Sequence, residues 1–355
     1  MSNYPMNEQR PSHSPLIAPL CDDHLIWEIW VSRYYLPTLV AADQIGLFPF
    51  LAQAPATVEE VVEGLSLGPL GAEAILNLMS SLGLLVQRQE RFYLTDEART
   101  YLLPESPYYS GNYLQSVMNN YPITATTMHE WLEKERAGTS YEAFKSWRFG
   151  DMSAELAELP WKIIPLLHSK TLPAAMGMAR NCDFSGVHQL LDVAGGSGGF
   201  CIALATRYPN MRFAVMELPV VCKVTQQYIA DYGLQDQIET IAADMFIDPW
   251  PSGYDGVFFS NVFHDWSLTQ CLHLATRSFE MLPPGGRIFV HEVLLNDTKA
   301  GPPVAAGYSM NMLALGGKQY TARELDQLLR EAGFTDVTIK PSFAYFSLVS
   351  ASKPR

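Results

Sequence analysis

Two runs of the sequence end in side chains that can move a proton. FFSNVFHDW places His264 and Asp265 just after an apolar run, and GRIFVHEV ends at His291 and Glu292. A neutral imidazole, whose ordinary pKa is about 6.5, accepts a proton from a hydroxyl at neutral pH, and a carboxylate on its other nitrogen orients the ring. His264 is therefore the candidate general base and Glu292 its orienting partner, with Asp265 beside them.

His291 and a metal site are the alternatives to weigh here. Adjacent residues of a strand face opposite ways, so His291 and Glu292 cannot both point at His264, and His291 is expected to be structural. His264 and Asp265 adjoin and could in principle ligate iron or zinc, but no further histidine follows a neighbouring strand on that face. No metal is expected.

A glycine-rich turn, AGGSGG, follows the apolar run LLDV. Glycines let the backbone turn sharply and approach a ligand, and a plain strand-to-helix turn needs only one or two of them. The candidate ligand-binding residues of this turn are Asp192, Ala194, Gly195, Gly196 and Gly198.

The next two apolar runs each end near a carboxylate. RFAVME ends at Glu217, followed by Leu218, and IETIAA is followed by Asp244, Met245 and Phe246. Glu217 is placed to accept two hydrogen bonds from a ribose diol. Asp244 is placed to accept one from an adenine amine, with apolar side chains against the ring.

A nicotinamide dinucleotide would use a similar turn. The GxGxxG register fails, however, because a motif beginning at Gly196 has Cys201 at its last glycine position. S-adenosylmethionine (SAM) has no pyrophosphate, and two carboxylates that hold its sugar and base suit it better. SAM is the expected cofactor.

The elements that must position these residues alternate between strands and helices from Gln189 onward. The strand runs are QLLDVA, RFAVME, IETIAA, GVFFSNV and GRIFVHEV. This alternation predicts an α/β fold with a parallel, doubly wound sheet that binds its ligand at the carboxyl ends of the strands.

The first part of the chain is mostly helical. Apolar residues recur at helical spacing from Leu25 to Leu51, a capping box begins at Thr57, and a helix from Gly71 to Leu82 precedes two short strands within 84–94. This order predicts a winged helix. Four arginines, no lysines and twelve acidic residues between Cys21 and Ser110 oppose nucleic-acid binding, so a dimerisation and lid role is favoured.

Length and composition predict more than one domain. We expect a tail at 1–19, a winged-helix dimerisation domain at 20–110, a helical linker and pocket region at 111–180, and a SAM-binding domain at 181–355. The formal charge of -13 opposes nucleic-acid and membrane partners. The five cysteines are expected to be reduced core thiols, and no apolar run suits a signal peptide, so a cytoplasmic location is expected.

Taken together, the motifs DVAGGSGG, MELP, ADMF, NVFHDW, LPPGGRIFVHEVLL and GGKQYTARELDQLLREAGF resemble the caffeic-acid and acetylserotonin type of O-methyltransferases, most closely their bacterial members. The resemblance covers about residues 20–353. It implies a homodimer with interlocked N-terminal helical domains, a seven-stranded sheet and His264 as the base. It also implies that Ser260 joins the glycine turn, Glu217, Asp244 and Met245 in contacting SAM.

The chain departs from the family pattern at two positions. Ala194 replaces the first glycine of the usual turn, and Gln319 stands where plant members have a second glutamate beside the histidine. An amide can hold the ring by its oxygen but adds no charge.

The acceptor itself does not follow from the motifs. Aromatic residues and methionines in the segments 118–147 and 308–312 fit a flat, apolar hydroxyl acceptor, a phenol or an enol. The candidate pocket residues are Met128, Trp131, Trp147, Tyr308, Asn311 and Met312. A C- or N-methyltransferase, a SAM-binding relative without methyl transfer, and a winged-helix regulator with SAM as effector remain alternatives.

Overall fold

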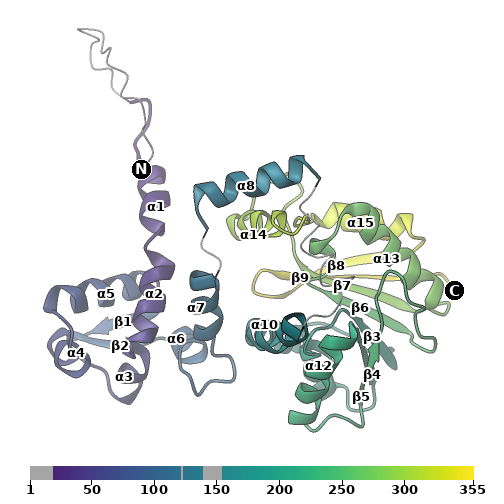
Figure 1. Ribbon diagram of the computed structural model, residues 1–355, viewed down its shortest axis with the longest axis horizontal. Coiled ribbons are helices and arrows are strands. Elements are labelled where there is room, and N and C mark those ends of the chain that lie inside the picture. Colours follow the sequence, from purple (N-terminus) through teal and green to yellow (C-terminus); the bar gives the residue numbers. More distant parts are fainter. Residues whose placement is uncertain (1–18, 121–122, 139–153) are drawn as a thin grey trace. The chain divides into compact units, whose positions relative to one another are not determined.

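The computed structural model describes residues 19–120, 123–138 and 154–355, with side chains from residue 158 in the last range (Figure 1). Contacts divide the chain into two units, one ending at Leu94 and the other beginning at Thr95. The finer domain boundaries expected at 110 and 180 remain predictions. Trp147 and residues 1–18 of the expected tail lie outside the described residues.

The first unit is helical apart from one hairpin. Its elements are α1 (His24–Ser32), α2 (Tyr35–Gln44), α3 (Leu47–Gln53), α4 (Val58–Leu65), α5 (Pro69–Ser81), β1 (Leu85–Arg88) and β2 (Arg91–Leu94). The capping box is present, because the Thr57 hydroxyl accepts the Glu60 N–H and the Glu60 carboxylate accepts the Thr57 N–H. Helix α5 begins at Pro69, earlier than expected, because proline is favoured in the first turn of a helix.

Helix α1 has no buried residue. Five of its large apolar side chains are 49–66% exposed, namely Leu25, Ile26, Trp27, Ile29 and Trp30. Within the described ranges, no single helix has the length and composition needed to cross a bilayer. The segment His24–Gln44 meets that criterion only when paired with α3, from which it is bent by 58°.

The second unit contains a seven-stranded sheet and the helices that cover it (Figure 1). Before the sheet come α6 (Asp96–Tyr101), α7 (Gly111–Asn120), α8 (Ala125–Arg136) and α10 (Ala154–Asn181). The parallel strands and their helices are β3 (Gln189–Val193), α11 (Gly199–Arg207), β4 (Arg212–Glu217), α12 (Pro219–Asp231), β5 (Ile238–Ala242), β6 (Gly256–Ser260), the 3-10 helix η1 (Phe263–Asp265), α13 (Leu268–Met281) and β7 (Arg287–Val293). The chain ends with α14 (Pro303–Leu313), α15 (Ala322–Glu331), β8 (Thr335–Phe343) and β9 (Phe346–Ser352).

The strand order is β5-β4-β3-β6-β7-β9-β8, with β5 to β7 parallel and β9 antiparallel to both of its neighbours. The chain moves outward from β3 to β5 and then returns to β6 on the other side of β3. Connections leave in opposite directions at β3 and β6, and sheets with this order bind their ligands at the carboxyl ends of the two strands concerned. The expected α/β class and seven-stranded sheet are confirmed.

The core lies on both faces of the sheet. Alternate strand residues divide between two apolar clusters, so Leu190 and Phe258 pack with α10 and α11, while Leu191 and Val257 pack with α13 and α15. This period of two follows from the pleat of a strand. It also fixes which face each residue at a strand end can reach.

Four of the five cysteines are buried as expected, but Cys21 is exposed, which corrects the expectation of five core thiols. Cys21 precedes the exposed helix α1, where no core is available to cover it. All five are free thiols.

Candidate active site

The glycine-rich turn between β3 and α11 lies against a buried acid. A Cβ added to Gly195 would lie 2.5 Å from Asp192 Oδ2, so only glycine allows this approach. Ala194 has a φ of +55°, the left-handed conformation that glycine adopts without strain. The substitution at the first position of the turn is therefore accommodated, with the backbone held in the form that glycine would take.

Asp192 is buried and has spare hydrogen-bonding capacity. Its Oδ2 accepts the Cys201 thiol at 3.5 Å, and its Oδ1 is buried with no partner in the structure. Burial raises the pKa of Asp192 to about 8, with the charge of Glu217 adding to the effect. An orphaned acceptor behind a glycine turn fits a ligand that carries hydrogen-bond donors or positive charge, as SAM does.

Glu217, at the end of β4, holds the turn from the other side. Its Oε1 accepts the Gly196 N–H at 3.1 Å and its Oε2 accepts the Leu218 N–H at 2.9 Å. Burial raises the pKa of Glu217, and these two backbone hydrogen bonds oppose the shift. Each carboxylate oxygen can accept a second hydrogen bond, so the expected capacity for a ribose diol is retained.

Asp244 begins the loop after β5. Its Oδ1 accepts the Phe246 N–H at 2.8 Å, while its own N–H donates to Asp248. Met245 and Phe246 are half-buried beside the core, and the Phe246 ring meets Trp266 edge-on at 4.7 Å. The loop thus presents a fixed carboxylate among apolar side chains, which suits an adenine ring.

Helix α10 also contacts the glycine turn, through a residue that the sequence motifs did not reveal. His168 Nδ1 lies 2.7 Å from the buried Ser197 hydroxyl, and its ring stacks on Tyr228 at 4.2 Å. Burial lowers the pKa of His168 to about 4, so its ring is neutral at pH 7. An isolated histidine on a helix with three internal prolines gives no motif from which this contact could be predicted.

A tight turn after β6 positions the candidate base. Asn261 adopts a φ of +53°, which asparagine tolerates better than most residues, and the chain then enters η1, where His264 is buried. Strands β6 and β7 are adjacent, which brings the ends of FFSNVFHDW and GRIFVHEV together as expected.

His264 is held by Glu292 on one side of its ring. Nδ1 lies 2.8 Å from Glu292 Oε2, and both side chains are buried. Glu292 Oε1 accepts the backbone N–H groups of Val262 at 3.1 Å and His264 at 3.4 Å. A carboxylate only accepts hydrogen bonds, so Nδ1 carries the proton and Nε2 has the free lone pair.

Two further side chains, those of Asp265 and Gln319, flank the ring. Asp265 Oδ1 lies 3.5 Å from Nε2. Burial alone would lower the pKa of His264, but the charges of Glu292 and Asp265 outweigh it, so the pKa lies above its ordinary value. Burial raises the pKa of Asp265 to about 6.

Gln319 contacts the ring with the other end of its amide than expected. Nε2 lies 3.3 Å from His264 Nδ1, and the buried Oε1 has no partner. Because a protonated Nδ1 faces the Glu292 carboxylate, a second donor facing the same nitrogen is unfavourable. Rotating the amide by half a turn, which leaves its shape unchanged, brings the oxygen to the ring.

His291 lies apart from this group. Its Nδ1 is 3.0 Å from the Ser260 hydroxyl, its Nε2 is 2.7 Å from the Ser342 hydroxyl, and its ring stacks on Phe346. Burial lowers the pKa of His291 to about 3. His291 and Glu292 therefore reach different neighbours, as the strand alternation requires. Ser260, expected to contact SAM, has its hydroxyl turned to His291.

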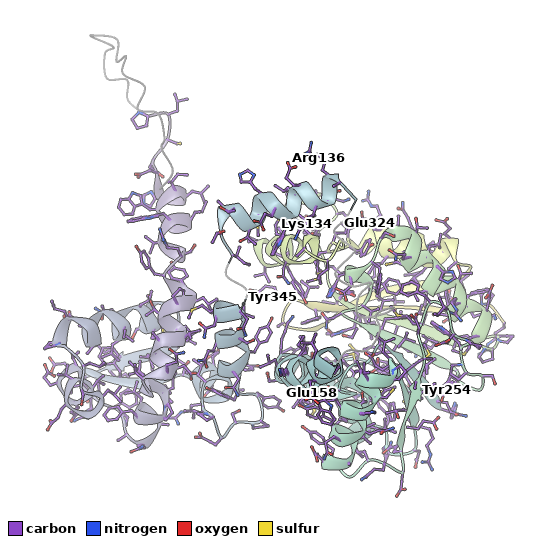
Figure 2. All side chains as sticks on the ribbon, in the orientation of Figure 1. Lys134, Arg136, Glu158, Tyr254, Glu324 and Tyr345 are labelled. Atoms are coloured by element: carbon purple, nitrogen blue, oxygen red, sulfur yellow. The ribbon has the colours of Figure 1, made fainter. Side chains whose placement is uncertain are left out.

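The segment before α15 fixes the backbone of His264. Lys318 donates its N–H to the His264 carbonyl at 2.8 Å, and a Cβ added to Gly317 would lie 2.0 Å from that oxygen. Glu324, labelled in Figure 2, accepts the Lys318 ammonium at 2.8 Å and closes the capping box of α15. The run GGKQ thus sets the position of His264 as well as supplying Gln319.

Tyr308 is an expected pocket residue whose ring contacts His264. Its ring meets that of His264 edge-on at 5.2 Å. Helix α14, which carries it, packs against α8, which carries the half-buried Met128 and Trp131. Met312 is buried, whereas Asn311 is exposed.

A lysine on α10 contacts Tyr308, and no motif in the sequence pointed to this residue. Lys170 Nζ donates to the Tyr308 hydroxyl at 2.9 Å and lies 5.7 Å from the centre of the Tyr113 ring. Across the described ranges, no group of three or more His, Cys, Asp or Glu side chains is placed to hold a metal ion.

Comparison with known proteins places the chain in a family. An O-methyltransferase domain model matches residues 159–335. The chain is 35% identical to 3-hydroxy-5-methyl-1-naphthoate 3-O-methyltransferase of Streptomyces sahachiroi, over 88% of this chain and 90% of that protein. It is 26% identical to the N,N-dimethyltransferase OxyT of Streptomyces rimosus, over 90% and 92% of the two chains.

A solved structure supports the same family assignment. Human N-acetylserotonin methyltransferase in complex with SAM matches 96% of this chain and 100% of its own, with a TM-score of 0.75 and 25% identity. The resemblance seen in the motifs and the expected cofactor are thereby confirmed. The chain belongs to the O-methyltransferase family and is a SAM-dependent methyltransferase.

Proposed function

We propose that the enzyme methylates a hydroxyl of a small aromatic natural product, with His264 as general base. The observation that carries this proposal is the contact between His264 Nδ1 and Glu292, which leaves Nε2 as the proton acceptor. A positioned base with a raised pKa is what a phenol requires, whereas an amine acceptor needs no strong base.

The reaction follows from this arrangement. Bound SAM supplies an electrophilic methyl group. Nε2 of His264 takes the hydroxyl proton as the acceptor oxygen forms its bond to the methyl carbon and the bond from that carbon to sulfur breaks. Glu292 stabilises the imidazolium that results, and Tyr308 contributes a wall against which a flat acceptor can lie. Most of the rate then comes from alignment of the oxygen with the methyl group.

For the cofactor, we propose that Glu217 holds the ribose and Asp244 the adenine amine. The glycine turn and Asp192 would face the methionine part, Leu218, Met245 and Phe246 would line the base, and Ser260 remains a candidate contact. Support comes from the fixed carboxylates at successive strand ends and from the unpartnered Asp192 oxygen.

The acceptor class is proposed from the relatives. The naphthoate methyltransferase acts on a fused aromatic hydroxy acid, and the half-buried Tyr308 ring beside His264 suits such an acceptor. A second relative, which aligns over most of both chains, is an N,N-dimethyltransferase by name. N-methylation is therefore the second candidate reaction.

The test is incubation of the protein with carbon-13 methyl-labelled SAM and a panel of naphthols, hydroxynaphthoates and matched aromatic amines. We expect a labelled methyl ether, identified by the carbon chemical shift. Label on nitrogen or ring carbon would contradict O-methylation. Binding of SAM without transfer to any of these acceptors would contradict the proposed reaction as a whole.

We also propose a homodimer formed through α1. An apolar surface with Trp27 and Trp30 half exposed is typical of an interface, and the helix buries none of its own residues. Light scattering on the full chain at micromolar concentration should give twice the monomer mass. A variant with both Leu25→Glu and Ile29→Glu should be monomeric, and a monomeric wild type would refute the proposal. The expected cytoplasmic location stays a prediction, supported by the five free thiols.

A further inference from the structure

Lys170 is a cation beside the base that the reaction above does not use. It is half-buried on α10, and of the side chains that the structure describes only Tyr308 gives its ammonium a hydrogen-bond acceptor. No described carboxylate forms an ion pair with it. The negative charges of Asp265 and Glu292 favour the charged form of Lys170 only from a longer distance, and both carboxylates contact His264.

The surroundings of Lys170 are aromatic. Its Nζ lies 4.6 Å from the centre of the Tyr308 ring and 5.7 Å from that of Tyr113. Rings attract a cation through their faces but leave most of its hydrogen-bonding capacity unused, since an ammonium has three donors. A partly desolvated ammonium with spare donors is an anion receptor.

Tyr308 links this receptor to the site of methyl transfer. Its hydroxyl accepts from Lys170, which leaves the phenolic hydrogen free to donate, and the same ring meets His264 at 5.2 Å. Burial raises the pKa of Tyr308, so the hydroxyl keeps its proton. One donor from each residue matches the two oxygens of a carboxylate. A phosphate presents three acceptor oxygens, one more than these two donors can pair.

We propose that Lys170 and Tyr308 bind a carboxylate carried by the methyl acceptor, so that the substrate is an aromatic hydroxy acid. This inference rests on the proposed function, because it concerns the acceptor whose hydroxyl meets His264. In a chain with a formal charge of -13, a local cation favours the approach of an anionic substrate.

The test measures binding to protein loaded with S-adenosylhomocysteine by calorimetry. The probes are 3-hydroxy-1-naphthoate, its neutral carboxamide, and 2-naphthol, which has the same ring and hydroxyl without the acid. The wild type should bind the acid most tightly. Lys170→Met should weaken binding of the acid roughly tenfold to hundredfold, the usual range for a charged hydrogen bond, and leave 2-naphthol nearly unchanged.

Matched variants distinguish a loss of carboxylate binding from a general effect on folding. Lys170→Arg should retain part of the preference for the acid, and Tyr308→Phe should lose less than Lys170→Met. Lys162→Met, an exposed lysine on the same helix, should bind all three probes as the wild type does.

Three outcomes would overturn the proposal. The first is an equal loss of affinity for the acid and for 2-naphthol in Lys170→Met, which would assign Lys170 to the shared hydroxyl. The second is an unchanged affinity of Lys170→Met for the acid, and the third is no binding of the acid by the wild type. Failure of the proposed function looks different. The acid would bind in a Lys170-dependent way, but SAM would transfer no methyl to its oxygen.

Discussion

His264 Nδ1 lies 2.8 Å from Glu292 Oε2, and the other oxygen of the same carboxylate accepts the backbone N–H of His264. Glu292 therefore fixes both the ring and the turn from which it projects. Breaking a buried pair of this kind leaves one charge without its partner and costs about 3–5 kcal/mol, so we expect the pair to contribute to stability as well as to the proposed catalysis.

Glu292→Gln tests the charge of this pair with little change in shape. An amide keeps an oxygen for the Val262 N–H but no longer stabilises the imidazolium, so kcat should fall by about 10²-fold to 10⁴-fold. The pKa of His264 should also fall, because the loss of a neighbouring negative charge disfavours the protonated ring. The acidic limb of the kcat/KM profile should move to lower pH.

Glu331→Gln is the matched control, since it removes a carboxylate that is exposed on α15. Its turnover and pH profile should equal those of the wild type. An acidic limb that stays in place in Glu292→Gln would show that this carboxylate does not govern the base.

Gln319→Glu tests the same electrostatics with the opposite sign. The new carboxylate lies where the amide is now 3.3 Å from Nδ1, so it should raise the pKa of His264 further. The base is the neutral ring, so the acidic limb should move to higher pH and activity at pH 7 should fall, while the plateau at high pH is kept. A limb that moves to lower pH would contradict this geometry.

Gly317→Ala tests how the backbone of the base is held. The added Cβ would lie 2.0 Å from the His264 carbonyl oxygen, so the backbone must shift. A misplaced ring should lower kcat by about 10²-fold, with SAM affinity retained. Gly71→Ala in α5 has nothing within 4 Å of its Cβ and should be fully active. Normal turnover of Gly317→Ala would mean that this close approach does not position His264.

Glu217→Ala tests the cofactor site. The carboxylate accepts the Gly196 and Leu218 N–H groups, so its loss removes a ribose acceptor and loosens the turn. Calorimetry should show SAM binding at least about tenfold weaker, since a buried hydrogen bond to a charged group contributes roughly 1.5–3 kcal/mol. Asp231→Ala, exposed at the end of α12, is the control. Unchanged affinity in Glu217→Ala would remove this residue from the site.

The sequence predicted the parts of the site that follow strands. Glu217, Asp244, His264 and Glu292 each stand at or just after the end of an apolar run, and parallel strands bring such ends to one edge. The separation of His291 from Glu292 followed from the pleat alone.

What the sequence could not predict comes from helices packed across the site. Lys170 and His168 lie on α10. The spacing of apolar residues in this helix does not show which side of it faces the site, so the contacts with Tyr308 and Ser197 follow only from tertiary packing. The close approach of Gly317 to the His264 carbonyl could not be predicted for a similar reason, because the two residues are more than fifty positions apart in the chain.

The central claim is that His264 is the general base, and turnover of His264→Ala and His264→Asn tests it most directly. Both variants should bind SAM about as tightly as the wild type and fold normally by circular dichroism. Their kcat should be lower by about 10²-fold to 10⁴-fold at every pH, the usual contribution of a positioned base. Near wild-type turnover of His264→Ala across the pH range would contradict the assignment and leave alignment of the acceptor as the source of the rate.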